Sequence, residues 1–303
     1  MFSTRKSVTG LALAVVIILV TLKIIVTTLT GSISILAQAA DSFLDLFAIL
    51  ITFVAVIVAV RPPDEDHPFG HGKVENIAAV IQALLIFTAG GLIIYSAIRR
   101  IISGTVIEMT EAGIGVMLFS MIASVFLSRH LHQVARDTDS LAIEASARNI
   151  NADIYSAAGV LIGLVVIRFT EFNILDPIIA IIVSLLILKA GYEVSRKAIE
   201  GLIDVRLPEV EEETIRLCIM EHYSEVVSFH RLRTRKSGNQ RFIYLHLVMP
   251  KHASVVEAHS MCDHLEEDLE ERLNNTNVTI HIEPCSIECT MCRVTCDLGN
   301  IID

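Results

Sequence analysis

The sequence contains no tryptophan, and aromatic residues make up only 6% of its 303 positions. Any belt of aromatic side chains at a membrane–water interface must therefore be weak. Two common functional signatures are also missing. No G-x-x-x-x-G-K-[S/T] motif occurs, because GHGK at 70–73 lacks the required spacing, and no H-E-x-x-H motif occurs. We therefore expect neither a nucleotide-binding P-loop nor the usual zinc-protease centre.

Charged residues are scarce as well, at 19%, whereas hydrophobic residues reach 53% and the mean hydropathy is +0.61. The charge is unevenly distributed along the chain. Positions 1–203 are nearly balanced, and most of the formal net charge of −10 comes from the last third. This shift predicts a boundary near residue 204 between a membrane domain and a small acidic soluble domain. An acidic domain disfavours nucleic acid as a partner and attracts cations.

Six apolar runs approach the roughly 20 residues that a helix needs to cross a bilayer. An even number of spans places both ends of the chain on one side of the membrane. That side has more flanking basic residues, which predicts that both termini and the acidic domain are cytoplasmic. The runs are 8–29, 33–60, 77–98, 112–134, 146–168 and 177–199. The cytoplasmic side has Arg5, Lys6, Arg61, Lys73, Arg129, Arg136, Arg148, Arg196 and Lys197, and the opposite side has Arg99, Arg100 and Arg168.

The acidic segment 205–283 has the pattern of a small α+β domain. Pro208 followed by EVEEE is a typical helix start, with proline and acids in the first turn. VVSFHRLRTRK and RFIYLHLVM alternate on either side of SGNQ, which predicts a hairpin. A helical period follows in ASVVEAHSMCDHLEEDLEERL, and NVTIHIEP reads as a last strand. We expect a three-stranded sheet with two helices on one face.

Two apolar runs carry polar pairs that a lipid-facing helix would not tolerate. Asp41 and Asp45 occur in ILAQAADSFLDLFAIL, and Asn149 and Asp153 occur in ARNINADIYSAAG. The i, i+4 spacing stacks each pair on one helix face. An ionised aspartate at the bilayer centre costs roughly 3 kcal/mol, and a divalent cation held between the pairs would offset the repulsion. The alternative is that these residues only hydrogen-bond neighbouring helices.

A second candidate site is the segment DEDHPFGHGK at 64–73, between the second and third predicted spans. Asp64, His67 and His71 offer one oxygen and two nitrogens, a set that suits a borderline metal such as zinc. The alternative is a polar loop that contains histidines by chance.

A third candidate site lies in the acidic domain. His230 and His246 fall on adjacent predicted strands, and His281 and Glu283 project from one face of the last strand. His259, in the second predicted helix, completes this candidate set. The alternative is that these are structural residues with satisfied hydrogen bonds. We expect the remaining histidines of the domain, His222, His252 and His264, to be ordinary surface residues.

Four cysteines follow the last predicted strand in PCSIECTMCRVTCD. In a reducing cytoplasm they would be thiols rather than disulfides. Four thiolates so closely spaced could hold one tetrahedral Zn²⁺ or an iron–sulfur cluster, and the alternative is a disordered, reactive tail. The four residues are Cys285, Cys289, Cys292 and Cys296. Cys218 and Cys262 stand alone within predicted helices, and we expect them in the core.

Taken together, these motifs resemble those of the cation diffusion facilitator family, and the chain is most similar to bacterial zinc and ferrous-iron efflux proteins. The resemblance covers about residues 8–285. It rests on DSFLD at 41–45, NINAD at 149–153 and DEDHPFGHGK at 64–73, and in the acidic domain on HRLRTRKSG, YLHLVMP, AHSMCDHLE and TIHIEP.

The resemblance implies an α-helical membrane protein with six transmembrane helices (1–203), a ferredoxin-like cytoplasmic metal-binding domain (204–284) and a cysteine-rich tail (285–303). It implies a homodimer in a bacterial or archaeal inner membrane, with Lys73 and Asp204 locking the dimer. The implied activity is proton-coupled efflux of divalent metal, so the chain is expected to be a secondary transporter and not an enzyme.

The metal itself stays open among Zn²⁺, Fe²⁺ and Mn²⁺. Zinc members of the family commonly have histidine where this chain has Asn149, and the cysteine tail extends beyond the usual end of the family. An alternative function is a non-transporting metal sensor or scaffold that pairs with another family member. An intramembrane hydrolase is disfavoured, because nothing supplies a nucleophile or a metal-bound water with a nearby general base.

Overall fold

The computed structural model describes residues 2–30, 33–103, 111–170, 175–222 and 225–285. The chain divides into two compact units, one ending at Leu202 and the other beginning at Ile203. Each unit is built around its own hydrophobic core.

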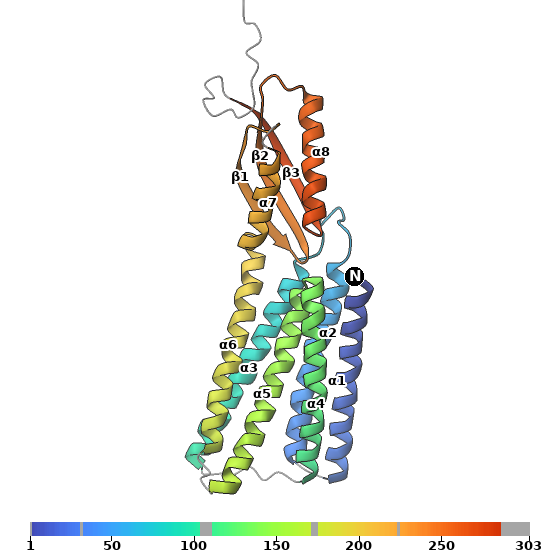
Figure 1. The fold of residues 1–303 in the computed structure, drawn as a ribbon. Helices are drawn as coiled ribbons and strands as arrows, with labels where there is room; N and C mark the ends of the chain where they lie inside the picture. Colours follow the sequence, from blue (N-terminus) through green and yellow to red (C-terminus); the bar gives the residue numbers. More distant parts are fainter. Residues whose placement is uncertain (1, 31–32, 104–110, 171–174, 223–224, 286–303) are drawn as a thin grey trace, which may run out of the picture. The chain divides into compact units, whose positions relative to one another are not determined.

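The first unit is a bundle of six long helices (Figure 1). Each helix contains one of the apolar runs read from the sequence. The helices are α1 (Phe2–Thr30), α2 (Ile33–Ala59), α3 (Val74–Ser103), α4 (Glu111–Thr138), α5 (Leu141–Thr170) and α6 (Leu175–Leu202).

Four helices of this bundle contain a described stretch long and apolar enough to cross a bilayer. These stretches are Arg5–Val26, Val74–Ser103, Ile114–Thr138 and Pro177–Leu202. In α2 the described apolar stretch, Asp45–Ala59, is shorter. The first half of α5 carries Glu144, Arg148 and Asp153, which lower its hydropathy. A helical membrane domain is therefore confirmed with four candidate spans, and the number six remains a prediction.

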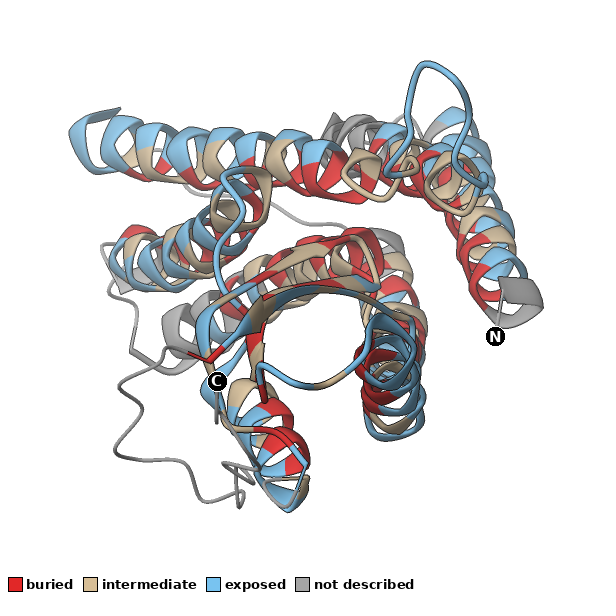
Figure 2. Ribbon diagram, turned by 90° about the horizontal axis from the view of Figure 1, so that it is seen from above, coloured by how far each residue is buried: buried red, intermediate tan, exposed pale blue. Residues whose placement is uncertain are grey.

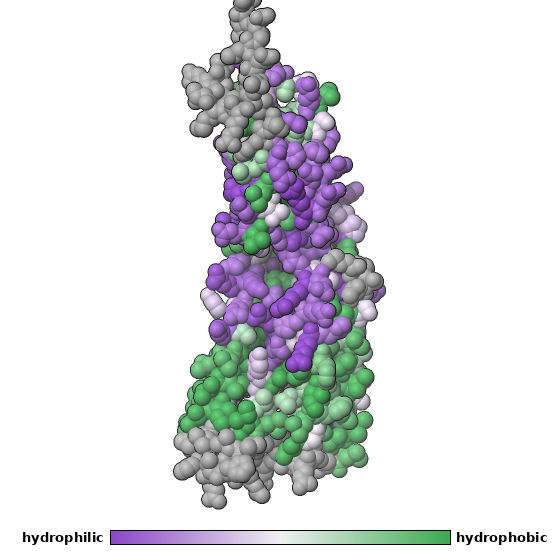
Figure 3. All heavy atoms as spheres, viewed as in Figure 1, coloured by the Kyte–Doolittle hydropathy of each residue, from purple (hydrophilic) through white to green (hydrophobic). Residues whose placement is uncertain are grey.

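The outside of the helical unit is covered by large apolar side chains, shown in green in Figure 3. Phe126, Leu185 and Leu186 are among the most exposed of them. A continuous apolar surface of this kind is not stable in water. In lipid it is the expected exterior, because the surrounding hydrocarbon chains are apolar as well. The helices satisfy their backbone hydrogen bonds internally, so they need no water. The protein is therefore an integral membrane protein.

Inside the bundle, the buried residues of each helix face the neighbouring helices (Figure 2). One core joins α1, α2, α4 and α5 around Ala12, Val56, Leu131 and Ile143. Small residues let α3 and α6 approach closely: a Cβ on Gly90 would lie only 2.8 Å from Leu188 Cδ2. Because lipid supplies no hydrophobic force between helices, close packing of this kind holds the bundle together.

A buried ionic network also joins α1 to α3. Arg5 Nη1 lies 3.0 Å from Glu75 Oε1, and the two side chains are 3% and 0% exposed. The Arg5 guanidinium also donates to the backbone carbonyl of Thr138, and Ser140 Oγ donates to Glu75 Oε2 at 2.5 Å. Both buried charges are thus paired and hydrogen-bonded, which is the condition under which a buried ion pair is tolerated.

The second unit has the element order read from the sequence. A helix, α7 (Glu209–Glu221), precedes the hairpin of β1 (Ser228–Ser237) and β2 (Gln240–Met249); α8 (Val255–Arg272) and β3 (Thr276–Pro284) follow. The sheet order is β1-β2-β3, antiparallel between β1 and β2 and parallel between β2 and β3. The α+β class of this unit is confirmed.

The helices of this unit cover one face of the sheet, and the alternation of side chains shows which face. Ile243, Leu245 and Leu247 of β2 are buried against the apolar sides of α7 and α8. The residues between them must project from the opposite face, since successive side chains of a strand alternate. Tyr244 and His246 therefore lie on the face of the sheet that α7 and α8 leave open. This open face carries the third candidate site.

Candidate metal centres

The structure brings Asp45 of α2 and Asn149 of α5 together inside the membrane unit. Asn149 is only 8% exposed, and its Nδ2 donates to Asp45 Oδ1 at 3.4 Å. Asp153 lies one turn further along the same face of α5 and is half-buried. The side chain of Asp41 lies outside the described part of the structure. Two polar residues predicted as ligands from separate helices are thus in contact at a helix–helix boundary.

A lysine that is not among the predicted site residues lies beside this contact. Lys23 of α1 donates from its Nζ to the Oγ of Ser42 on α2, at 2.5 Å. Ser42 is three residues before Asp45 in a helix, so the lysine approaches the same region of α2. The sequence alone could have marked Lys23 as a candidate functional residue, because it lies within the apolar run 8–29 and an ionisable residue at membrane depth is usually functional.

The three residues of the predicted loop site lie close together in the structure. Asp64 Oδ1 lies 3.1 Å from His67 Nδ1, and Asp64 Oδ2 lies 3.4 Å from His71 Nε2. One ligand atom from each of the three residues lies within 4.8 Å of the others. Gly70, with φ of 77°, turns the chain so that His71 returns to Asp64.

Two features favour a cation in this loop. The backbone N–H of His67 donates to the Asp64 carboxylate and lowers the pKa of Asp64, so the carboxylate is ionised at neutral pH. The Nδ1 of His71 is buried without a hydrogen-bond partner in the described part of the chain. A buried orphan nitrogen is costly unless something occupies it.

In the second unit the pairing of the strands brings the histidines into line. His230 is paired with His246 across β1 and β2, and His246 is paired with His281 across β2 and β3. Glu283 contacts all three: its oxygens lie 2.6 Å from His246 Nδ1, 3.3 Å from His230 Nε2 and 3.8 Å from His281 Nε2. The His246 hydrogen bond lowers the pKa of Glu283. His230, His246 and Glu283 offer ligand atoms within 4.8 Å of one another.

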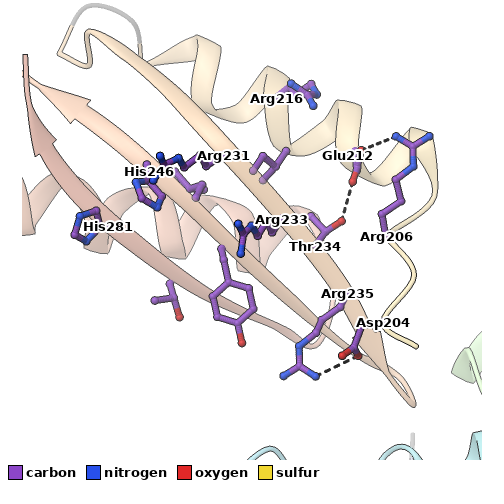
Figure 4. A pocket seen from close by; sticks show the side chains of 14 residues that line it. Asp204, Arg206, Glu212, Arg216, Arg231, Arg233, Thr234, Arg235, His246 and His281 are labelled. Atoms are coloured by element: carbon purple, nitrogen blue, oxygen red, sulfur yellow. Dashed lines mark hydrogen bonds and ion pairs between the residues drawn. The ribbon is translucent and has the colours of Figure 1, made fainter. Parts of the chain in front are cut away.

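A β-bulge gives β1 the register that this site needs. The pairing shifts between His230 and Arg233, and Arg231 has a positive φ of 53°. The extra residue lets Phe229 and Leu232 both pack against the core. The hollow beside the histidines is lined by Arg231, Arg233 and Arg235 (Figure 4). Arg235 is partly neutralised by Asp204, at 3.4 Å.

Two predicted ligand sets are only partly placed by the structure. His259 lies on α8 beside Asp263, at 3.5 Å, and among the described residues it is not grouped with the sheet histidines. Of the tail cysteines, Cys285 is buried and carries a free thiol. Cys289, Cys292 and Cys296 lie outside the described residues. Cys218 and Cys262 are buried in the core as predicted, and burial raises the pKa of Cys262 to about 11.

We call the group of His230, His246 and Glu283 the sheet site. We expect His246→Gln to weaken Zn²⁺ binding to the sheet site by about tenfold or more, because His246 contacts Glu283 and lies between His230 and His281. The measurement is a Zn²⁺ titration of the purified full-length protein. His252→Gln is the matched control, since the exposed His252 belongs to none of the groups of clustered ligands in the described chain. Equal zinc binding in His246→Gln and wild type would remove this site from consideration.

Comparison with known proteins agrees with these features. Residues 10–203 match the family model described as the cation efflux transmembrane domain, and residues 207–285 match the cation efflux protein, cytoplasmic domain. The cation-efflux pump FieF of Salmonella choleraesuis (strain SC-B67) is 32% identical over 94% of this chain and 93% of its own length. An uncharacterized transporter of Synechocystis, sll1263, is 31% identical over 84% of this chain and 83% of its own.

Solved structures similar to part of this chain are also known. A structure of CzrB is 37% identical and covers 26% of this chain and 99% of that chain, with a TM-score of 0.26. The metal-bound C-terminal domain of the CzcD transporter from Thermotoga maritima is 24% identical and covers 32% of this chain and 100% of that chain, with a TM-score of 0.24. On the two family models and the full-length relatives, this chain belongs to the cation diffusion facilitator, or cation efflux, family of metal transporters.

Proposed function

We propose that this protein exports divalent transition-metal cations from the cytoplasm in exchange for protons. The observation that carries the proposal is the contact between Asp45 and Asn149, which places polar ligands from α2 and α5 together inside an apolar bundle. Family membership and the FieF relatives, which are named as cation-efflux pumps, support the direction of transport. The permeant ion would bind to Asp41, Asp45, Asn149 and Asp153.

Binding of the ion requires a local change at Asn149. In the structure its NH₂ group faces Asp45, so the amide must turn over to offer its oxygen to a cation. The carboxylates then neutralise the metal charge. On the far side of the membrane protons compete for the same oxygens. In a site without water, a protonated carboxyl group has a lower free energy than a charged one. With asparagine at 149, the aspartates must carry the protons.

The two cytoplasmic sites fit a regulatory role. The loop site of Asp64, His67 and His71 and the sheet site around Glu283 both have imidazole and carboxylate donors, which suit borderline metals. Metal bound at these sites would favour one conformational state if that state binds it more tightly. In this proposal abundant cytoplasmic metal stabilises the transport-competent form.

We further propose the division of the chain into a six-span domain (1–203), a ferredoxin-like cytoplasmic domain (204–284) and a cysteine tail (285–303). The proposed assembly is a homodimer, with Lys73 and Asp204 at its junction. Both termini would be cytoplasmic in a bacterial or archaeal inner membrane, as the flanking basic residues favour. The tail would bind Zn²⁺ or an iron–sulfur cluster, as the number and spacing of its cysteines favour.

Competition flux through proteoliposomes under a pH gradient tests the transport activity and its selectivity together. Three carboxylates and one amide form an all-oxygen site, which suits Mn²⁺ and Fe²⁺, whereas imidazole favours Zn²⁺. We expect wild type to carry Mn²⁺ or Fe²⁺ at a rate comparable with Zn²⁺. We expect Asn149→His to shift the Zn:Mn ratio toward Zn²⁺ by about tenfold, the change that 1.4 kcal/mol produces.

Asn151→His is the matched control for this experiment. Asn151 is also on α5, but its side chain accepts from Ser128 and contacts His132 on α4 instead of Asp45. An unchanged Zn:Mn ratio in Asn149→His would contradict the selectivity argument. Absence of pH-dependent flux for any of the three metals in wild type would contradict the proposed transport, and would leave a sensor or scaffold as the function.

A further inference from the structure

The second unit contains another cluster of potential metal ligands, on the side of the sheet that α7 and α8 cover. His222 is the C-cap residue of α7, and His264 and Asp268 lie on α8. One ligand atom from each of the three residues lies within 4.8 Å of the others. From the sequence, we expect His222 and His264 to be ordinary surface residues. His264 is exposed, whereas His222 is partly buried, and packing of α7 against α8 brings their rings to 5.0 Å between centroids.

The hydrogen bond of His222 fixes which ring nitrogen is available to a ligand. Its Nδ1 lies 3.0 Å from the backbone carbonyl oxygen of Cys218, which can only accept, so Nδ1 carries a hydrogen. The other nitrogen, Nε2, faces Asp268 Oδ2 at 3.4 Å. In neutral histidine, that nitrogen and the carboxylate oxygen are both acceptors. A cation bound between these two atoms would satisfy both of them.

This arrangement matches how histidine ligands are usually held. A metal-ligating histidine donates its second ring N–H to a carbonyl or carboxylate, which fixes its tautomer and orientation. The Cys218 carbonyl has that role for His222. His222 is also well shielded, with only 13% of its side chain exposed, and Asp268 is 26% exposed. A cation here would be partly removed from competing water.

The two residues on α8 have the geometry of paired ligands on a rigid element. His264 and Asp268 are separated by four positions, so they lie on the same helix face. The adjacent side of the helix is anchored in the core by Met261, Leu265 and Leu269. Ligands on a packed helix keep their geometry better than ligands on a loop.

Arg272, on the same helix as His264 and Asp268, is paired with Glu221. Arg272 forms two hydrogen bonds with Glu221, at 2.6 Å and 3.0 Å. That bidentate contact lowers the pKa of Glu221 and keeps the guanidinium paired. The surface around the cluster is rich in acids, because α8 carries the sequence EEDLEER. The local field therefore attracts cations.

We propose that His222, His264 and Asp268 bind a divalent transition-metal ion, as a site distinct from the sheet site of His230, His246 and Glu283. Two imidazoles and one carboxylate suit Zn²⁺ or Co²⁺, with the fourth position left to water. The two sites lie on opposite faces of the sheet, since the strand histidines project from the open face and α7 and α8 cover the other. Metal at this site ties the end of α7 to α8.

Hydrogen exchange of the full-length, metal-stripped protein tests the site. Zn²⁺ is expected to slow amide exchange in peptides covering 215–222 and 262–272, because it cross-links the two helices. The background variant is His246→Gln, which weakens the sheet site and leaves this effect in place. In this background, both Asp268→Asn and His264→Gln are expected to abolish the Zn²⁺-induced protection.

Glu270→Gln is the matched control. It removes the same charge from the same helix, but position 270 is rotated by 200° from Asp268 at 100° per residue. Zn²⁺-induced protection in Glu270→Gln should equal that of the background. Equilibrium dialysis should show one zinc ion fewer per chain for Asp268→Asn than for Glu270→Gln. Undiminished protection and zinc content in both Asp268→Asn and His264→Gln would overturn the proposal and leave only the contact between His222 and Asp268.

Discussion

Replacing Asp153 with asparagine is expected to abolish metal transport while the protein still folds. The substitution keeps the size of the side chain and removes one negative charge from the proposed site next to Asn149 and Asp45. Loss of a residue that only orients a metal ligand already costs about 10–100-fold in affinity or activity, so loss of a ligand should cost at least as much. In the proposed exchange the carboxylate of Asp153 also binds a proton, which asparagine cannot do. Flux of Zn²⁺, Mn²⁺ and Fe²⁺ into proteoliposomes is the measurement.

Two comparisons keep this result interpretable. Asp45→Asn should behave like Asp153→Asn, since the two residues belong to the proposed ligand pairs on α2 and α5. Asp137→Asn, at an exposed position at the end of α4, should transport like wild type. Elution as a single species and an unchanged thermal midpoint would show that the variants are folded. Wild-type flux in a folded Asp153→Asn protein would rule out the proposed membrane site.

Replacing Glu75 with alanine is expected to destabilise the membrane unit by about 3–5 kcal/mol, the usual cost of removing one partner from a buried ion pair. Arg5 would be left almost fully buried, without the carboxylate of Glu75 and with the carbonyl of Thr138 still accepting a hydrogen bond. Ser140 would lose the acceptor of its hydroxyl as well. The measurement is thermal unfolding of the purified protein in detergent, where the midpoint should fall by many degrees.

A double replacement separates lost pairing from general damage. Arg5→Met combined with Glu75→Leu removes both charges and keeps similar volume, so it should recover much of the lost stability. Glu200→Ala is the control, because it breaks an exposed i, i+4 pair with Arg196 on α6 and should change the midpoint little. A Glu75→Ala protein as stable as Glu200→Ala would show that the buried pair contributes nothing to the fold.

Much of this molecule could be predicted from local patterns. The six apolar runs predict six helices, because an apolar run of about 20 residues has the length and composition of a membrane-spanning helix. The i, i+4 pairs at 41–45 and 149–153 follow from the helical period. Alternation in 226–236 and 241–249 predicted the hairpin. The loop site of Asp64, His67 and His71 could be read directly, since its three residues lie within eight positions of one another.

What the sequence by itself determined is therefore whatever a single element or turn fixes: helix, strand, membrane domain and the polar pairs that share one face of a helix. Only the tertiary structure decided which elements face each other. It brought His222 to Asp268, joined Arg5 to Glu75 and placed Lys23 beside Ser42. It also left His259 beside Asp263 instead of the sheet histidines. The physical reason is that spacing along the chain fixes the face on which a side chain lies, while packing of whole apolar faces determines which faces meet.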